Sequence, residues 1–158
     1  MARPTMRGKD MINGKYGRAF VEIEGQRYDL FNVVNFEAKV NSSNKALQAL
    51  DRHLDVHMEA GGEGKFTGEA YRPAPMFTKL LRNKKDTLLT IRFDLQITEH
   101  DPGFEGGPNT VIYTDCLLDE YTLSKLDVTN TELRESISGT FDDFMVAEEY
   151  STLQGMRR

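Results

Sequence analysis

The segment around residues 53–67 carries the residue types best suited to chemistry, two histidines followed by a glycine-rich run. The run Gly61–Thr67 reads GGEGKFT, which invites a phosphate-binding interpretation. A P-loop built on this Gly-Lys pair needs glycine at position 59 and Ser or Thr at position 66, where the chain has Glu59 and Phe66. A dinucleotide-binding fingerprint built on Gly62 and Gly64 needs a third glycine at position 67, where the chain has Thr67. The run therefore predicts a hairpin turn over Gly61–Gly64 and no phosphate site.

His53 and His57 stand four residues apart, a spacing that on a helix would bring two imidazoles to one metal ion. Apolar residues alternate with polar ones here, as is typical of a strand, at Leu54, Val56, Met58 and Ala60. Four residues of strand span about 13 Å, too far for two ligands that each bind an ion at about 2 Å. We therefore predict no metal site, either here or at His100, which lies alone in a loop-like segment.

Three pairs of adjacent acids could suggest acid–base chemistry: Asp119-Glu120, Asp142-Asp143 and Glu148-Glu149. Neighbouring side chains on a strand point to opposite faces, so we interpret these acids as solvated or interface charges. The one cysteine, Cys116, precedes two leucines and is predicted to be a buried thiol. No catalytic signature such as G-x-S-x-G occurs. We expect no enzyme activity, no catalytic or metal-binding residues and no cofactor.

Composition fits one soluble domain. The chain has 158 residues, of which 39% are hydrophobic and 28% charged, as in an ordinary globular protein. No apolar stretch approaches the roughly 20 residues that span a bilayer, and the N-terminus lacks the apolar region of a secretory signal. A single cysteine excludes an internal disulfide and suits a reducing cytoplasm. The net charge of −5 disfavours a general nucleic-acid binder.

The charges are unevenly distributed along the chain. Residues 1–18 hold one acid, Asp10, and five basic residues: Arg3, Arg7, Lys9, Lys15 and Arg18. Residues 99–150 hold thirteen acids against Lys125 and Arg134. Two interpretations follow. The N-terminus is either a basic arm that docks on an acidic surface of a neighbouring copy or a solvated terminus, and charge alone favours the second.

Alternation of apolar and polar residues predicts strands along most of the chain. They cover residues 19–23, 27–41, 54–60, 65–71, 87–98, 111–121 and 133–145, with less regular alternation in the last two. Glu24–Gln26 is predicted to be a hairpin turn. Two strands, 27–41 and 87–98, are long, since about 12 residues span roughly 40 Å, and each keeps one polar face. Long strands with one polar face suit a subunit whose strands line the channel of an assembly.

One helix is predicted, over Pro73–Asn83. It opens with two prolines, which suit a first helical turn, and continues with an apolar stripe of Met76, Phe77, Leu80 and Leu81. Cations follow at its C-terminal end, where the helix dipole favours them: Arg82, Lys84 and Lys85. The segment Ser43–Leu50 fits either a helix or a strand. His100–Asn109 is rich in Gly and Pro and is predicted to be a loop.

Several short motifs follow one another along the chain in an order that is typical of a known family. They begin with Asn13–Phe20 (NGKYGRAF) and continue with Phe36–Val40 (FEAKV) and Gly68–Tyr71 (GEAY). The helix, the strand Leu88–Thr98 and the closing Gly139–Phe144 (GTFDDF) complete them. In order and spacing the chain resembles the XkdM-like tail tube proteins of contractile phages and phage-derived bacteriocins, over about residues 13–150. It departs from them in an expanded loop at 100–109 and in the tail 150–158.

The resemblance implies a mainly β fold, a small β-sandwich or split barrel with one flanking α-helix. It implies a structural subunit that forms hexameric rings, which stack into a hollow tube inside a contractile sheath. The partners would be further copies, the sheath protein, baseplate and tail terminator proteins, and a tape measure protein in the lumen. The protein would belong to a phage tail or tail-like particle assembled in the bacterial cytoplasm, without inserting into a membrane.

Within one domain (1–158) we expect three peripheral parts: an N-terminal arm (1–12), a protruding hairpin or loop (41–64) and a C-terminal tail (146–158). The resemblance places ring-to-ring contacts in the loop that corresponds to 41–64. The residues predicted to contact neighbouring subunits are Arg3, Arg7, Lys9, Asn44, Leu47, Leu50, Leu54, Val56 and Met58.

Two other classes of protein remain open at this point. A tube protein of the type VI secretion kind would share the fold and the ring. A monomeric β-barrel that binds a small ligand would need an apolar interior, whereas these strands offer one apolar face that the helix and core would cover. Among tubes, one that conducts DNA and one from a DNA-free bacteriocin both fit the sequence.

Overall fold

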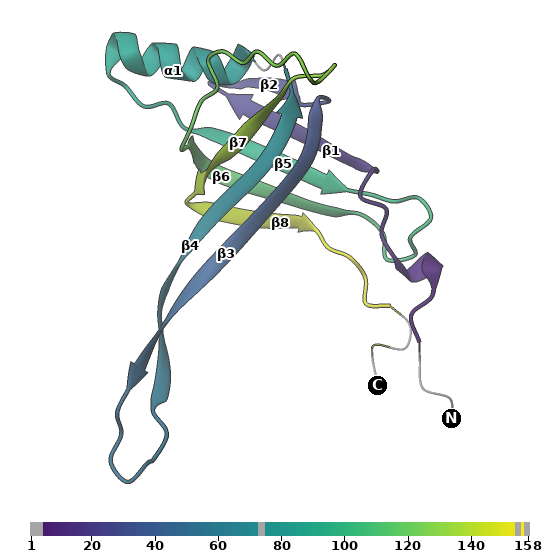
Figure 1. The fold of residues 1–158 in the computed structure, drawn as a ribbon. Coiled ribbons are helices and arrows are strands. Elements are labelled where there is room, and N and C mark those ends of the chain that lie inside the picture. Colours follow the sequence, from purple (N-terminus) through teal and green to yellow (C-terminus); the bar gives the residue numbers. More distant parts are fainter. Residues whose placement is uncertain (1–4, 73–74, 154–155, 157–158) are drawn as a thin grey trace. The chain divides into compact units, whose positions relative to one another are not determined.

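Antiparallel strands make up most of the regular structure, as a computed structural model of residues 5–72, 75–153 and 156 shows (Figure 1). The chain divides into two units, described separately below. Unit 1 comprises residues 1–31, 91–115 and 143–158, and unit 2 comprises residues 32–90 and 116–142. Strand β6 (Asn109–Leu118) contributes residues to both. The predicted mainly β fold with a flanking helix is confirmed.

Unit 1 is a sheet with the strand order β2-β1-β5-β6-β8. Strand β1 (Gly17–Ile23) lies between β2 (Gln26–Asp29) and β5 (Phe93–Glu99), and β8 (Asp143–Glu148) pairs with β6. A short 3-10 helix, Gly8–Asp10, precedes the sheet. Glu24 and Gly25 join β1 to β2 with φ angles of 50° and 80°, the pattern of a type I′ hairpin turn. The turn predicted at this junction is confirmed.

The core of unit 1 comes from the alternation read in the sequence. Ala19, Val21 and Ile23 are buried, with the polar residues of β1 turned outward. Val21 lies opposite Leu95 of β5, which is also buried. Full burial of one such side chain contributes about 1.5–3 kcal/mol. These few residues therefore fix which face of β1 turns inward.

Unit 2 is built on a very long hairpin. Strands β3 (Val33–Leu47) and β4 (Val56–Tyr71) pair along their whole length. Residues Gly64–Tyr71 of β4 also pair with β7 (Arg134–Phe141). The end of β6 adds two further pairs to β7. Helix α1 (Pro75–Thr87) follows β4, and its Phe77 and Leu80 are buried.

The sheet of unit 2 has a tightly packed aromatic core. Phe66, Ala70 and Phe141 are buried, and the Phe66 ring stacks on Phe36 with 5.9 Å between centroids. Gly139 lies beside them, where a Cβ atom would collide with the carbonyl oxygen of Leu117 and stand 2.7 Å from the Phe66 ring. Only glycine fits there, because the crowding involves backbone as well as side chain.

The predicted turn at Gly61–Gly64 is wrong. These residues belong to β4 and pair with Val40–Ser43 of β3, and the chain reverses later, within residues 48–55. The register shifts between Ser43 and Asn44, opposite Gly61, whose φ is 121°. Glycine adopts such a φ without a steric penalty, so the run accommodates a β-bulge instead of a turn.

The strand predicted at 87–98 is present from Phe93 onward, but its predicted start and the predicted helix end are wrong. The helix runs on to Thr87, and β5 starts only at Phe93. Leu88 has a left-handed φ of 61° and donates its N–H to the Lys84 carbonyl at 2.9 Å, which closes the helix. Lys84 and Lys85 extend the helix because both are good helix formers. Pro73, predicted as the first helical residue, lies outside the described residues.

Two other predicted strands are each divided in the structure. The segment 27–41 splits into β2 and β3, because the Leu30 N–H bonds to Ala19 of β1 whereas Asn32 accepts from Tyr71 of β4. The segment 43–50, whose sequence fits either a helix or a strand, continues β3 as far as Leu47. The segment 133–145 splits into β7 and β8, and β8 includes the first residues of the predicted C-terminal tail.

Candidate subunit-contact surface

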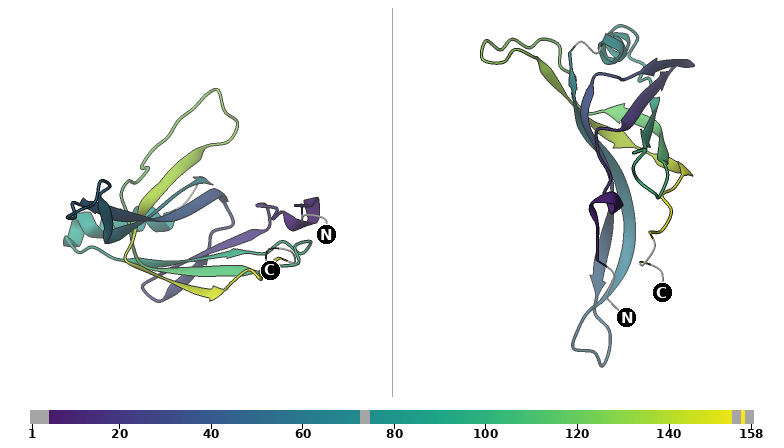
Figure 2. Two further views of the ribbon diagram at one scale, coloured as in Figure 1. Left: turned by 90° about the horizontal axis from the view of Figure 1, so that it is seen from below. Right: turned by 90° about the vertical axis from the view of Figure 1, so that its right-hand side faces the viewer.

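The outer half of the β3–β4 hairpin is a bare two-stranded ribbon (Figure 1). In the described part of the chain, residues Val56–Glu63 of β4 pair with β3 alone, whereas Gly64–Tyr71 also pair with β7. Figure 2 shows the ribbon running well past the end of β7. All residues from 41 to 63 are described, and none of them is buried. An isolated two-stranded hairpin is marginally stable in water, so a partner surface would stabilise this ribbon.

The ribbon exposes apolar side chains at the positions predicted to contact other subunits. Leu47 lies opposite Val56 at the last pair of the ladder, and Met58 pairs with Lys45. Leu50 and Leu54 lie in the connecting segment with 95% and 71% of their surfaces exposed. Asn44 pairs with Glu59 beside the bulge. The structure therefore brings all six predicted residues of this segment onto one element, and clustered exposed apolar side chains mark interaction sites.

The N-terminal arm is held to its own subunit by an acid from the C-terminal half. The Lys9 ammonium lies 3.0 Å from a carboxylate oxygen of Glu105. The Asn13 N–H donates to Asp101 at 2.9 Å. Arg7 is exposed, and its N–H donates to Asp10. Arg3, the third predicted contact residue of the arm, lies outside the described residues. Lys9 thus has an acidic partner within its own chain.

An open groove lies next to this arm in unit 1. Its volume is about 570 Å³, and its walls come from the start of β1, the end of β5 and the loop after β5. The lining residues are Lys15, Tyr16, Gly17, Arg18, Thr98, His100, Pro102 and Pro108. This site was not predicted from the sequence, in which Lys15 and Arg18 stand out only as charges. Their closeness to prolines some 90 residues away follows from the pairing of β1 with β5.

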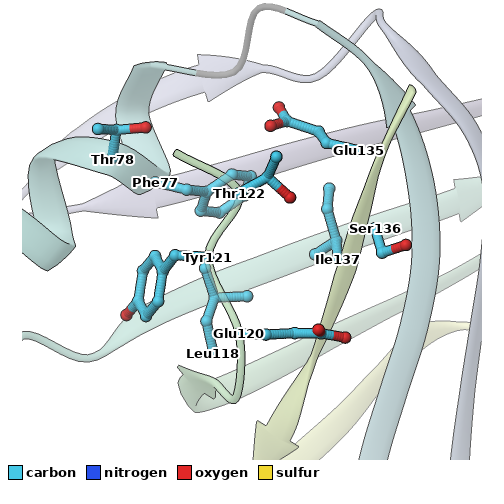
Figure 3. A pocket seen from close by; sticks show the side chains of 9 residues that line it. All are labelled: Phe77, Thr78, Leu118, Glu120, Tyr121, Thr122, Glu135, Ser136 and Ile137. Carbon is cyan, nitrogen blue, oxygen red and sulfur yellow. The ribbon is translucent and has the colours of Figure 1, made fainter. Parts of the chain in front are cut away.

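A much smaller cavity lies within unit 2 (Figure 3). Its volume is about 20 Å³, enough for about one water molecule. Figure 3 shows Phe77 on its α1 side and Glu135 on its β7 side. Burial raises the pKa of Glu135, and Arg72, 3.9 Å away, partly opposes this shift. One oxygen of Glu135 and one nitrogen of Arg72 have no hydrogen-bond partner among the described residues. The cavity is too small for an organic substrate.

Other sequence candidates for chemistry are scattered in the structure. His53 and His57 lie at the ribbon, and His100 lies in the groove of unit 1. Among the described residues, no group of three His, Cys, Asp or Glu side chains could hold a metal ion. Cys116 is fully buried, as predicted. No helix in the described ranges has the length and apolar character needed to cross a membrane.

Comparison with solved structures shows which known chains share this fold. The fold is similar to a chain of the six-fold symmetrised baseplate of the anti-feeding prophage, with a TM-score of 0.60 and 11% identity, covering 92% of this chain and 97% of the other. It is also similar to a chain of the PVC sheath–tube complex, an extracellular contractile injection system in its extended state. There the TM-score is 0.62 and the identity 12%, over 86% and 90% of the two chains. The fold is that of subunits of contractile injection systems.

Sequence comparison then gives the family. A family model described as phage tail tube protein matches residues 4–148. The chain belongs to the phage tail tube protein family, and its role is that of a structural tail tube subunit. It is 27% identical over 147 residues to the phage-like element PBSX protein XkdM of Bacillus subtilis (strain 168), across 93% of this chain and 97% of the relative. The family resemblance read from the sequence is confirmed.

Proposed function

We propose that this tail tube subunit closes into hexameric rings, that the rings stack into a hollow tube, and that a contractile sheath surrounds the tube. The observation that carries the proposal is the bare ribbon of β3 and β4, an element with exposed leucines and no buried residue between 41 and 63. The similarity to a chain of a sheath–tube complex and to one of a six-fold symmetrised baseplate supports the sheath and the ring number.

Ring formation would also cover strand edges that are unpaired in the single subunit. Within the described strands, β2 pairs with β1 alone and β3 pairs with β4 alone, so each presents one unpaired edge. Unpaired edges invite uncontrolled association unless something covers them. In a closed ring every subunit makes the same head-to-tail contact, so a small number of copies can cover the edges that meet there and growth in that direction stops.

In this proposal the segment 41–64 is the stacking element between rings. The partners are further copies of the chain, a sheath protein, baseplate and tail terminator proteins, and a tape measure protein in the lumen. The particle assembles in the host cytoplasm. The role is structural and not catalytic.

Assembly of the purified protein tests this function. We expect rings or tubes in negative-stain electron microscopy, and a matching high-mass species in size-exclusion chromatography with light scattering. Assembly should proceed without nucleotide and should survive EDTA, since no group of described residues could hold a metal ion. A species that stays near the monomer mass of 18.0 kDa at every concentration would contradict the proposal and favour a monomeric ligand-binding barrel.

A further inference from the structure

The groove of unit 1 combines an apolar wall with exposed positive charge. Tyr16, 52% exposed, and the rings of Pro102 and Pro108 supply the apolar part. Lys15 and Arg18 supply two cations, both exposed, and neither forms an ion pair with any described residue. Its volume of about 570 Å³ falls within the roughly 300–1,000 Å³ of sites that hold a compact ligand. The groove therefore suits a segment with apolar side chains next to acids.

The connection between β3 and β4 has that composition. Residues 48–55 read QALDRHLD, in which Leu50 and Leu54 are each followed by an aspartate. Both leucines are largely exposed. Asp51 and Asp55 form no ion pair with any described residue, and Arg52 is the one basic residue between them apart from His53. Apolar and acidic groups at this tip thus match the apolar and basic groups of the groove.

We propose that residues 48–55 of one copy bind in the Lys15–Arg18 groove of another copy, with Leu50 and Leu54 against Tyr16 and the prolines and the aspartates beside the cations. The inference rests on the proposed function, because it names the surface that receives the stacking element. A projecting tip and a separate recess form a heterologous contact, which repeats without limit when all copies share one orientation. Burying the leucines would supply most of the affinity, and the charges would set register and association rate.

Cross-linking between different copies tests the contact directly. Tyr16→Cys protein is mixed with Leu54→Cys protein, assembled and oxidised, so that a disulfide between the two variants can arise only between copies. We expect a dimer band on a non-reducing gel that reducing agent removes. The matched control mixes Leu54→Cys with Val128→Cys, a fully exposed position outside the groove, and should give no more dimer than either variant alone.

Charge reversal gives a second, independent readout. Lys15→Glu and Arg18→Glu should each slow tube formation as followed by light scattering, and Asp55→Lys should restore the parent rate in at least one of the two combinations. Lys84→Glu, the same change on the exposed face of α1, should assemble like the parent. Circular dichroism melts identify any variant that fails to fold. The other charge-reversal variant and the cross-link then test the proposed contact.

The outcomes separate this inference from the function on which it rests. Parent protein that forms no assembly overturns both. Parent tubes together with no cross-link, and reversals that assemble at the parent rate, overturn the groove assignment alone. A further arm titrates a fluorescent single-stranded oligonucleotide into the parent and Lys15→Glu proteins. Tight binding by the parent that Lys15→Glu abolishes would assign the groove to nucleic acid and overturn the proposal.

Discussion

Gly139 lies where β7 meets the end of β6, and there is no room at this point for a side chain. The contacts around it come from the Leu117 backbone and from the Phe66 ring, which is itself buried against Phe36. Neither neighbour can move without disturbing a strand or the aromatic core. Glu135 on the same strand shows the opposite situation, a buried carboxylate beside a small cavity, whose raised pKa reflects its loss of solvation.

We predict that Gly139→Ala destabilises the subunit by at least the 1–3 kcal/mol typical of overpacking, because a Cβ atom there overlaps backbone. Urea denaturation followed by circular dichroism measures the change. Gly14→Ala is the matched control, since a Cβ atom at position 14 meets nothing within 4 Å. Equal stability of the two variants would mean that the junction of β6 and β7 is looser than described.

At the scale of elements, the β3–β4 hairpin has an inner and an outer half with different roles. The inner half pairs with β7 and carries the buried Phe66 and Ala70. The outer half contributes nothing to the core, since no residue from 41 to 63 is buried. The boundary between the halves lies close to the bulge at Ser43 and Asn44. If the outer half is the stacking element, as proposed, changing it alone should separate folding from assembly.

We predict that replacing residues 44–60 with a Gly/Ser linker of roughly four residues, a normal hairpin loop length, leaves a folded subunit that forms no tubes. The replacement keeps Ser43 paired with Gly61 and leaves the core intact. Thermal melts and electron microscopy provide the two readouts. If the shortened protein still makes tubes of normal length, the ribbon is not the stacking element; loss of folding would contradict the division into halves.

The elements that could be predicted from the sequence are those whose signals are local. Alternation over Ala19–Ile23 and the Glu24-Gly25 turn were readable because burial and turn chemistry act within a few residues. The glycine run 61–64 was misread because its role depends on the strand opposite it. The groove of unit 1 could not be predicted, since its lining residues come from segments far apart in the chain. The hairpin contact residues were placed by family resemblance and not by pattern.

At the scale of the whole molecule, the basic N-terminal segment makes only weak charge contacts among the described residues. The net charge is −5, with basic residues concentrated near the N-terminus. The ion pair between Lys9 and Glu105 is about half exposed on both sides, so it contributes about 0–1 kcal/mol. An arm held by such weak contacts can exchange its own acid for one on a neighbouring copy at little cost.

We predict that neutralising Arg3, Arg7 and Lys9 to Gln slows tube formation at low salt without preventing folding. The difference should shrink toward 1 M salt, where the Debye length is about 3 Å. Light scattering across ionic strength measures the rate. Lys79→Gln, Arg82→Gln and Lys84→Gln together make the same change in charge on exposed positions of α1 and serve as control. A rate equal to that of the parent at low salt would identify the arm as a solvated terminus.

The bare ribbon also has a consequence for the timing of growth. Because no buried side chain holds it, we expect the cross-strand hydrogen bonds of the ribbon to open more readily in the free subunit than those of the core. Each incoming copy must therefore lose conformational entropy as it docks, which slows encounters between two free copies more than addition to a long preformed end. In the proposed tube, purified protein should therefore assemble after a lag, and added preformed tubes should shorten that lag.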